Sequence, residues 1–304
     1  DGLPLTVQGG RLQPLTYEMP VSSAQIKSAL LLAGVAGSVE VSIREPGGRS
    51  RDHTERLLRA FGYSVRESDG WIRFSPRGRI EPFEMEVPGD PSSAAFLVGA
   101  ALLADQGQLR VAGIGVNPTR IGFLEVLRRM GAEVRIEAGA AQMGEPVGDL
   151  LVEPAELRGT EVAPWEIPGL IDEVPLLAVL ASRAKGTTIF REVGELRVKE
   201  SDRLGLLAEN LRRVGSRAEV SGDDLVVEGA TRPPKGKVRT GADHRLAMAF
   251  AVLGTLPKAD VRIDDMACAA VSFPGFAETL RSVFGVAKKF APRSAPSAEP
   301  FSLG

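Results

Sequence analysis

The segment Leu196–Arg203 places two cations and a carboxylate within about one helical turn. Because residues three or four apart share a helix face, we expect Lys199, Glu200 and Arg203 to lie together. A carboxylate beside two cations suits proton transfer to an anionic substrate, since the cations bind the anion and tune the acid. The segment is predicted to open a helix directly after a strand over 187–193, where helix N-termini bind anions. A salt-bridged helix face is the alternative interpretation.

A second acidic pair, Asp172 and Glu173, falls inside a predicted apolar helix over 171–180. A carboxylate in such a place is costly unless it faces a polar cleft. Arg245 begins another predicted helix, as Arg203 does, and the two helices belong to consecutive copies of a repeat. Guanidinium groups recognise phosphate and carboxylate in a bidentate manner, so we expect both arginines to face one cleft.

Three further polar clusters precede predicted helices, namely Ser22–Gln25, Ser50–His53 and Gly89–Ser93. Exposed N–H groups and the helix dipole suit such positions to phosphate or carboxylate. Plain N-capping by Ser and Asp is the alternative, and we favour it for Asp90. For Ser50–His53, an anion site and a capping serine beside a solvated Arg51–Asp52 pair both remain open.

Several common chemistries lack their sequence signatures. The chain has no GxxxxGK[ST] loop, no GxSxG motif and no convincing GxGxxG between a strand and a helix. Its two histidines, His53 and His244, are not at metal-ligand spacing. We therefore predict acid–base chemistry on an anionic substrate, with no metal and no nucleotide cofactor.

The composition is that of an ordinary globular protein. The 304 residues, with a formal net charge of −2, 43% hydrophobic and 25% charged residues, are enough for two domains. The near-neutral balance argues against nucleic-acid binding, and no apolar run is long enough to span a membrane. The single cysteine, Cys268, excludes a disulfide framework and predicts a reducing, cytoplasmic location. We expect Cys268 to be a small core residue.

The strongest organisational signal is a unit that occurs four times: an apolar helix, a strand, an amphipathic helix ending at glycine, and two strands, which are missing only from the fourth copy. Helices are predicted over 22–34, 53–62, 91–103, 119–131, 168–184, 199–215, 243–256 and 274–285. Strands are predicted over 38–44, 63–66, 71–75, 108–114, 133–137, 149–153, 187–193, 217–220, 224–228 and 260–264. A glycine just past the last turn supplies a left-handed cap, and we expect this of Gly62, Gly131, Gly215 and Gly285.

These units predict an α/β (α+β) fold of repeated βαβαββ modules. A boundary is expected near 86–91, where Val-Pro-Gly-Asp-Pro interrupts the pattern. Residues 1–87 would then be the remnant of one domain, with a leading strand over 3–10 and one unit. Residues 88–288 would form a second domain of three units. The segment 289–304, rich in Ala, Pro and Ser, is predicted to be a disordered tail.

Eight motifs now make the chain recognisable, and they occur in the following order: Ser23–Ser28, Ser50–Glu55, Pro88–Ala95, Gly115–Arg120, Ile171–Pro175, Leu196–Arg203, Asp243–Arg245 and Ser272–Gly275. From about Leu3 to Gly285 the chain closely resembles the bacterial EPSP synthases, the 3-phosphoshikimate 1-carboxyvinyltransferases of the shikimate pathway, which leads to aromatic amino acids. The resemblance implies the two-domain enolpyruvyl transferase fold, an inside-out α/β barrel whose helices converge on an interdomain cleft.

The resemblance also implies an activity, in which the enolpyruvyl group of phosphoenolpyruvate is transferred to the 5-hydroxyl of shikimate 3-phosphate. Asp172 would act as base toward that hydroxyl, and Glu200 with Lys199 would handle the proton on the methylene group. The residues implied for phosphoenolpyruvate are Lys199, Arg203, Arg245 and Gln25. Those implied for shikimate 3-phosphate are Ser23, Ala24, Gln25, Ser50, Arg51, Asp172 and Lys199.

Departures from the family pattern define the alternatives. The opening segment of the family has no counterpart here, so we expect an N-terminally incomplete chain that needs a complementing N-terminal segment as partner. Negligible turnover is expected from the chain alone, because half of the clamp that positions both anions is missing. A catalytically incompetent fragment, or a substrate-binding half, is therefore one alternative. UDP-N-acetylglucosamine enolpyruvyl transferase is a weaker one, since it lacks a Lys-Glu-Ser-Asp-Arg run.

Two single positions also depart from the pattern of some family members. Ala24 resembles the branch described as glyphosate-tolerant, and Val271 replaces a lysine of some members.

Overall fold

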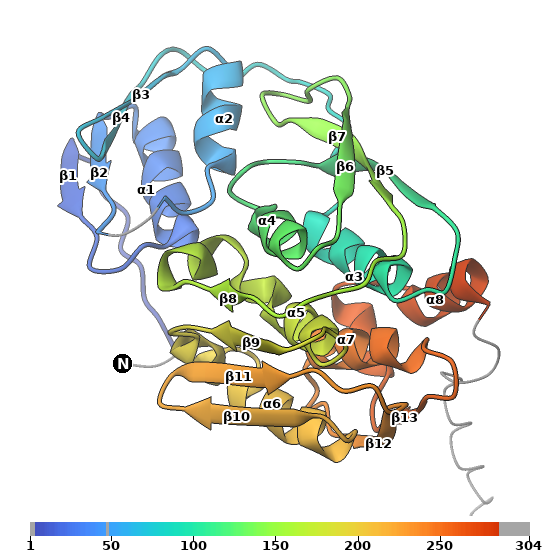
Figure 1. The fold of residues 1–304 in the computed structure, drawn as a ribbon. Coiled ribbons are helices and arrows are strands. Elements are labelled where there is room, and N and C mark those ends of the chain that lie inside the picture. Colours follow the sequence, from blue (N-terminus) through green and yellow to red (C-terminus); the bar gives the residue numbers. More distant parts are fainter. Residues whose placement is uncertain (1–3, 47–48, 286–304) are drawn as a thin grey trace, which may run out of the picture. The chain divides into compact units, whose positions relative to one another are not determined.

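The computed structural model describes residues 4–46 and 49–285. The chain forms two compact units, each assembled from separate stretches of sequence (Figure 1). Unit 1 comprises Asp1–Pro88, Gly115–Ile121 and Ala138–Gly148, and unit 2 comprises Gly89–Ile114, Gly122–Glu137 and Asp149–Gly304. The domain limits predicted at 1–87 and 88–288 stay a prediction, and the predicted tail over 289–304 lies outside the described residues.

Unit 1 is built around one βαβαββ module. Its elements are β1 (Leu15–Glu18), α1 (Ala24–Gly37), β2 (Val41–Arg44), α2 (His53–Ala60), β3 (Ser64–Ser68) and β4 (Trp71–Ser75). The strands form one sheet in the order β1-β2-β4-β3, in which β1 and β2 are parallel and β4 is antiparallel to both of its neighbours. The core includes Leu31, Ile43, Leu58 and Phe74.

The first strand begins later than predicted. Residues 4–10 form no strand or helix, and β1 occupies Leu15–Glu18 instead. Pro4 and the Gly9-Gly10 pair explain the difference, because proline lacks a ladder donor and glycine weakens strands. The strand that does form pairs in parallel with β2, residue by residue from Leu15 opposite Val41.

Helix α1 is apolar on more than one side. Lys27, Leu31 and Gly34 are buried toward the sheet, and a Cβ at Gly34 would lie 2.7 Å from Val41 Cγ2, so glycine permits the close approach. On another side Ile26 and Leu32 are exposed, Leu32 by 52%. A helix that is apolar all round is ordinarily buried on all sides.

Unit 2 contains the third and fourth copies of the repeat and most of the second, whose connections over 115–121 and 138–148 belong to unit 1. The second copy has α3 (Pro91–Leu102), β5 (Leu109–Gly115), α4 (Gly122–Arg129), β6 (Val134–Ala138) and β7 (Val147–Val152). The third has β8 (Glu161–Val162), the 3-10 turns η1 (Pro164–Gly169) and η2 (Ile171–Glu173), α5 (Val174–Ala181), β9 (Thr187–Phe190), η3 (Gly194–Val198), α6 (Arg203–Arg213), β10 (Arg217–Ser221) and β11 (Asp224–Glu228). The fourth has β12 (Lys235–Val238), α7 (His244–Gly254), β13 (Asp260–Ile263), η4 (Ala267–Val271) and α8 (Phe276–Phe284).

The sheets of unit 2 repeat the strand order of unit 1. The third copy gives β8-β9-β11-β10, with β8 and β9 parallel and β11 antiparallel to its neighbours. The second copy gives β5-β7-β6, and its leading strand is reduced to a parallel bridge between Gly89 and Ile114. The fourth gives the parallel pair β12-β13. The predicted repeat of βαβαββ modules is therefore confirmed.

Helices α3, α5 and α7 pack against one another in the interior of unit 2 (Figure 1). Every residue of α5 is buried, and α3 and α7 are buried along nearly their whole length. Apolar residues on all sides are what three mutually packed helices require. Charged or polar residues gather where these helices begin, at Asp90, Glu173 and Asp243.

The glycine helix ends are confirmed, since Gly62, Gly131, Gly215 and Gly285 have φ values of 83°, 93°, 92° and 64°. Several predicted helices start later than expected, and the largest delays are in the spans 168–184 and 199–215. The span 168–184 opens with 3-10 turns because Pro168 interrupts the α-helical hydrogen bonds. The span 199–215 becomes helical only at Arg203. The short strands β8 and β12 were not predicted.

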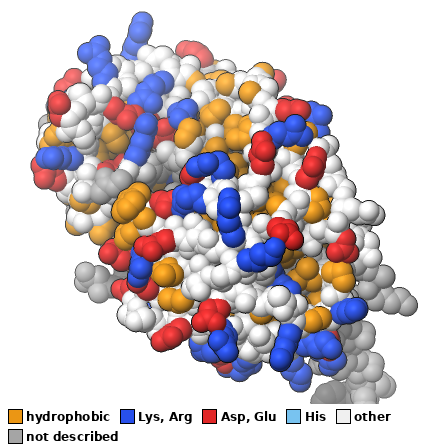
Figure 2. All heavy atoms as spheres, viewed as in Figure 1, with side chains coloured by type: hydrophobic (Ala, Val, Ile, Leu, Met, Phe, Trp, Pro, Cys, Tyr) orange, Lys and Arg blue, Asp and Glu red, His pale blue; other side chains and the backbone are white. Residues whose placement is uncertain are grey.

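Figure 2 shows Lys and Arg side chains interspersed with Asp and Glu over the face in view. This distribution agrees with the formal net charge of −2. No helix in the described part of the chain combines the length and apolarity needed to cross a membrane.

Candidate active site

In unit 2, Asp172 contacts guanidinium groups from two helices. Its Oδ2 lies 3.4 Å from Arg245 Nη2, its Oδ1 lies 3.9 Å from Arg203 Nη1, and its carbonyl oxygen accepts a hydrogen bond from Arg245 Nη1 at 3.2 Å. The carboxylate side chain remains 18% exposed. Asp172 is thus a partly accessible carboxylate between two cations.

Arg203 is the first residue of α6 and is fully buried. Its Nε donates to Asp243 Oδ2 at 2.8 Å, and its Nη2 donates to Glu200. Buried donors without a partner remain on both arginines: neither Arg203 Nη1 nor Arg245 Nε has a hydrogen-bond partner among the described residues. Buried N–H groups cost free energy when unsatisfied, so these two groups are suited to donate hydrogen bonds to a bound anion.

The start of α6 explains why Lys199 and Glu200 do not share its face. Asp202 caps the helix by accepting a hydrogen bond from the Gly205 amide at 3.1 Å, so the helix begins at Arg203. Lys199 and Glu200 therefore lie in the connection ahead of the helix. Lys199 Nζ donates to Glu195 of η3, whereas Glu200 contacts Arg203. The expectation of one helix face for Lys199, Glu200 and Arg203 was wrong.

Asp243 links the starts of α6 and α7. As the N-cap of α7 it accepts hydrogen bonds from the Arg245 amide at 2.9 Å and the Leu246 amide at 3.3 Å. The same carboxylate accepts from Arg203 and from Ser201 Oγ, the latter at 3.0 Å. Burial raises the pKa of Asp243, but the hydrogen bond and charge of Arg203 outweigh burial and lower it below the ordinary value. Asp243 therefore stays ionised and fixes Arg203.

His244 follows Asp243 and is also buried. Burial, together with the positive charge of Arg245, lowers the pKa of His244. A neutral imidazole at neutral pH follows from this direction.

In unit 1, the residues expected at shikimate 3-phosphate lie at the starts of α1 and α2. Ser23 is the N-cap of α1 and accepts from the Ile26 amide at 3.4 Å. Ala24 and Gln25 are the first two helical residues, and the Gln25 side chain is exposed. Ser50 and Arg51 precede α2, and Ser50 Oγ is a buried hydroxyl with no hydrogen-bond partner among the described residues.

In unit 1, a buried cluster of charged residues connects the start of α1 with the start of α2. Lys27 Nζ lies 3.1 Å from Glu45 Oε2 and 2.8 Å from Glu55 Oε1, with Lys27 and Glu55 fully excluded from solvent. Lys27 also donates to the Ser50 carbonyl at 3.4 Å, and the Ser50 amide donates to Glu45. The segment that carries Ser50 is therefore tied to α1.

Asp52 is not solvated, whereas one interpretation of Ser50–His53 expected a solvated pair. Asp52 is fully buried and accepts hydrogen bonds from Arg56 Nε at 2.8 Å and Asn117 Nδ2 at 2.7 Å. Burial raises the pKa of Asp52, and the hydrogen bonds from Arg56 and Asn117 lower it by more. The neighbouring His53 places Nδ1 2.8 Å from Glu145 Oε1. Asp52 and His53 thus hold unit 1 together.

Two expectations of structural roles are confirmed. Asp90 caps α3 by accepting from the Ser93 amide at 2.9 Å. Cys268 is buried, and burial raises the pKa of its thiol to about 11. No three His, Cys, Asp or Glu side chains within the described ranges gather in a way that could hold a metal ion.

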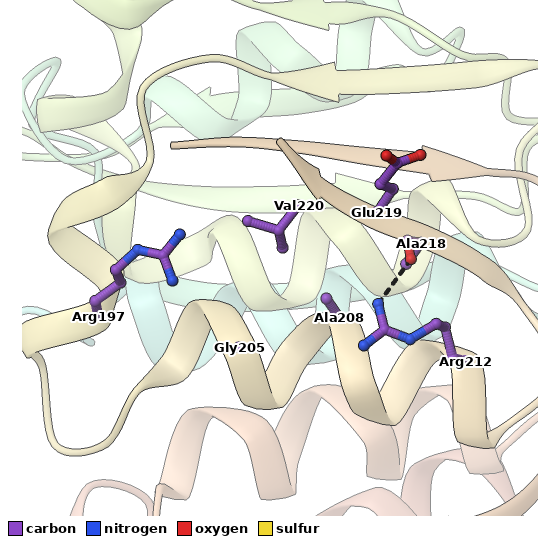
Figure 3. Close-up of a pocket in the computed structure, with 7 residues that line it drawn as sticks. All are labelled: Arg197, Gly205, Ala208, Arg212, Ala218, Glu219 and Val220. Carbon is purple, nitrogen blue, oxygen red and sulfur yellow. Dashed lines mark hydrogen bonds between the residues drawn. The ribbon is translucent and has the colours of Figure 1, made fainter. Parts of the chain in front are cut away.

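A separate hollow lies between α6 and β10 in unit 2 (Figure 3). Arg212, one of its lining residues, donates to the Ala218 carbonyl at 2.9 Å, the contact drawn as a dashed line. The lining residues are Arg197, Gly205, Ala208, Arg212, Ala218, Glu219 and Val220. None of them is a predicted site residue, so the hollow is distinct from the candidate active site.

Sequence reasoning missed three supporting groups. It considered N-capping for the cluster Asp243–Arg245 but not the bond of Asp243 to Arg203, and it gave no role to Lys27 or to the contact of Ser92 with Glu173. Capping by Asp243 could be considered because an acidic residue directly ahead of an apolar run is a typical N-cap. Lys27 and the Ser92 contact depend on long-range packing that no local pattern indicates.

Comparison with solved structures gives the class of protein. The enolpyruvyl transferase NikO from Streptomyces tendae superposes with a TM-score of 0.70 over 90% of this chain at 21% identity, which shows a shared fold. EPSP synthase from Acinetobacter baumannii superposes with a TM-score of 0.83 at 35% identity, covering 90% of this chain and 63% of that structure. The fold is that of the enolpyruvyl transferases.

The family model for EPSP synthase (3-phosphoshikimate 1-carboxyvinyltransferase) matches residues 1–280. The chain belongs to this family. Curated relatives named 3-phosphoshikimate 1-carboxyvinyltransferase include those of Desulforamulus reducens, 45% identical, and Pelotomaculum thermopropionicum, 47% identical, each over 282 residues and 92% of this chain. The chain spans 65% of the length of each of these two relatives.

Proposed function

We propose that this chain carries the larger part of a 3-phosphoshikimate 1-carboxyvinyltransferase. The observation that carries the proposal is that Asp172 and Glu200 both contact the Arg203 guanidinium, and Asp172 also contacts Arg245. Acid–base groups beside anion-binding groups suit a reaction between two phosphorylated substrates. Family membership and the names of the relatives support the same reaction.

In the proposed addition step, Asp172 takes the proton of the 5-hydroxyl of shikimate 3-phosphate. The hydroxyl oxygen bonds to C2 of phosphoenolpyruvate, and Glu200 delivers a proton to the methylene carbon. In the elimination step Glu200 removes a proton from the resulting methyl group, the C–O bond to phosphate breaks, and the double bond reforms. The leaving phosphate takes up the proton that Asp172 accepted in the addition step, so both carboxyl groups return to their starting states, with EPSP and phosphate as products.

Arg203 and Arg245 would bind phosphoenolpyruvate and offset its negative charge. The buried N–H groups that lack partners, Arg203 Nη1 and Arg245 Nε, support this role. Lys199 would join them, since a long side chain paired with Glu195 at the surface can change partner at little cost. Gln25 is proposed as a further contact to phosphoenolpyruvate.

Within unit 1, the residues at the starts of α1 and α2 would bind shikimate 3-phosphate. Ser23 and Gln25 stand at the start of α1, where amide groups favour anions. The buried Ser50 hydroxyl supplies a donor, and Arg51 supplies charge for a phosphate group. A cytoplasmic location is part of the proposal and fits the single cysteine.

Turnover is proposed to need an N-terminal segment equivalent to the part of the relatives that this chain does not match. Two features of the described residues support such a partner. The apolar side of α1 is exposed at Leu32, whereas its counterparts α3, α5 and α7 are buried against one another. In addition, β13 pairs only with β12 among the described strands, whereas β2 and β9 each also pair with an antiparallel strand.

A phosphate-release assay tests the proposal. The chain is assayed with both substrates, alone and with the opening segment of the Desulforamulus reducens relative added. We expect release only with the segment and with both substrates present. No release in the complete mixture would contradict the proposed reaction. Full activity from the chain alone would contradict the need for the segment, and a preference for UDP-N-acetylglucosamine as acceptor would point to the sister enzyme.

A further inference from the structure

We propose that Glu173 is a positioning residue that holds the turn bearing Asp172 through a buried hydrogen bond to Ser92; this inference rests on the proposed function of Asp172. Adjacent in sequence, the two carboxylates have different environments. Asp172 is partly exposed and faces two arginines, whereas Glu173 is only 4% exposed and faces α3.

The contact between Glu173 and Ser92 joins two helices that lie far apart in the sequence. Ser92 Oγ donates to Glu173 Oε1 at 2.5 Å, and both side chains are buried. Ser92 is the second residue of α3, and Glu173 is the residue directly before α5. The Glu173 carboxylate does not cap its own helix. Its hydrogen bond therefore serves the connection to α3 rather than the start of α5.

The surroundings can accommodate a buried carboxylate. A carboxylate without hydrogen bonds would be expensive in an apolar interior. Here it lies at the start of α5 and contacts the first turn of α3, where helix dipoles favour negative charge. The neighbouring Asp90 takes the capping role on α3 through Ser93, which leaves the Ser92 hydroxyl for Glu173.

This contact bears on Asp172 because the turn η2 has three residues, Ile171 to Glu173. On one side the Asp172 carbonyl and carboxylate are held by Arg245 of α7. On the other, Glu173 fixes the end of the same turn to α3, which packs against η2. A base must stand within hydrogen-bond reach of the proton that it removes, and a displacement of about 1 Å can cost about 100-fold in rate.

The test uses the variants Glu173→Ala, Glu173→Gln and Ser92→Ala, with Ser93→Ala as matched control on the same helical turn. Crystal structures of the 304-residue variants give the separation of Asp172 Oδ2 from Arg245 Nη2. The rate constant kcat and the KM for phosphoenolpyruvate are measured in the complemented enzyme described above. The Glu173→Gln variant keeps an oxygen acceptor for Ser92 and is the conservative rescue.

We expect Glu173→Ala to displace Asp172 and lower kcat by about 10- to 100-fold with little change in KM. Glu173→Gln and Ser93→Ala should keep most of the activity, and Ser92→Ala combined with Glu173→Ala should be no worse than Glu173→Ala alone. An unmoved Asp172 with full kcat in Glu173→Ala, or equal losses in the Gln and Ala variants, would overturn the inference. If the complemented wild type is inactive, the proposed function fails, and the crystal structures still decide whether Glu173 positions Asp172.

Discussion

Arg203 donates a hydrogen bond to Asp243 at 2.8 Å, and both side chains are fully excluded from solvent. Because Asp243 also caps α7, one carboxylate fixes the guanidinium at the start of α6 and the helix that presents Arg245. Both arginines of the candidate site, Arg203 and Arg245, are thus positioned by the same buried carboxylate. Replacing Asp243 should therefore affect the stability of the fold as well as the geometry of the site.

Asp243→Ala should lower the free energy of unfolding by about 3–5 kcal/mol, because removing one partner of a buried ion pair leaves the other charge uncompensated. Urea denaturation of the chain measures the change. The matched control is Asp260→Ala, since Asp260 pairs with Arg262 at the surface and exposed pairs contribute about 1 kcal/mol or less. Equal losses of unfolding free energy in the two variants would show that the buried pair contributes no more to stability than the exposed pair.

The stability of the chain should also depend on pH through Asp243. Its pKa in the folded chain is lowered from the ordinary value of 3.8, so the folded state binds fewer protons than the unfolded state. The contribution is therefore complete above this value and is lost as the pH falls below it. Urea titrations between pH 6 and pH 3 should show a shallower acid loss in Asp243→Asn than in the wild type. An unchanged slope would contradict the assigned ionisation.

Lys27 offers a parallel test in unit 1. Lys27→Met would leave Glu45 and Glu55 buried without their cation, and we expect a loss of about 3–5 kcal/mol. Hydrogen exchange of α1 and α2 amides would report the loss within this unit. Lys185→Met is the control, because the Lys185–Glu156 pair is largely exposed and should contribute at most about 1 kcal/mol. Unchanged protection in Lys27→Met would mean that the cluster does not stabilise unit 1.

A substitution at Gly229 would test the close approach of the backbone at this residue to the backbone at Ala184. A Cβ at this position would lie 1.6 Å from the Ala184 carbonyl oxygen, and backbone cannot move aside as a flexible side chain can. Gly229→Ala should therefore destabilise the chain by about 3 kcal/mol or more in urea denaturation. Gly169→Ala, where a Cβ meets nothing within 4 Å, should stay within about 0.5 kcal/mol. Similar behaviour of the two variants would contradict the packing described here.

The sequence was sufficient for features that depend on local chemistry. The left-handed caps at Gly62 and Gly131 and the N-cap at Asp90 follow from residue type and position, because each is decided within one turn of helix. The family was also recognisable from its motifs, and the comparisons confirm it. Asp172 was singled out because a carboxylate in an apolar run is costly, and the structure places it between two arginines.

The features that the sequence did not reveal depend on a choice between alternative partners close in sequence, or on contacts between residues far apart in sequence. Whether α6 starts at Lys199 or at Arg203 was decided by Asp202, which captures the Gly205 amide. Lys199 has two acidic neighbours in the sequence, Glu195 and Glu200, and it forms its ion pair with Glu195. The Arg203–Asp243 bond joins residues 40 positions apart, so it appears only when α6 and α7 are packed. No local pattern distinguishes such contacts from surface charge.

If Asp172 and Glu200 perform the proton transfers of enolpyruvyl transfer, then kcat for phosphate release by the complemented enzyme should fall in Asp172→Asn and in Glu200→Gln. General acid–base groups typically contribute about 100- to 10,000-fold, so each variant should lose at least about 100-fold. Glu219→Gln, which alters an exposed carboxylate on β10, should keep the wild-type rate. Wild-type rates in both Asp172→Asn and Glu200→Gln would contradict these proton-transfer roles.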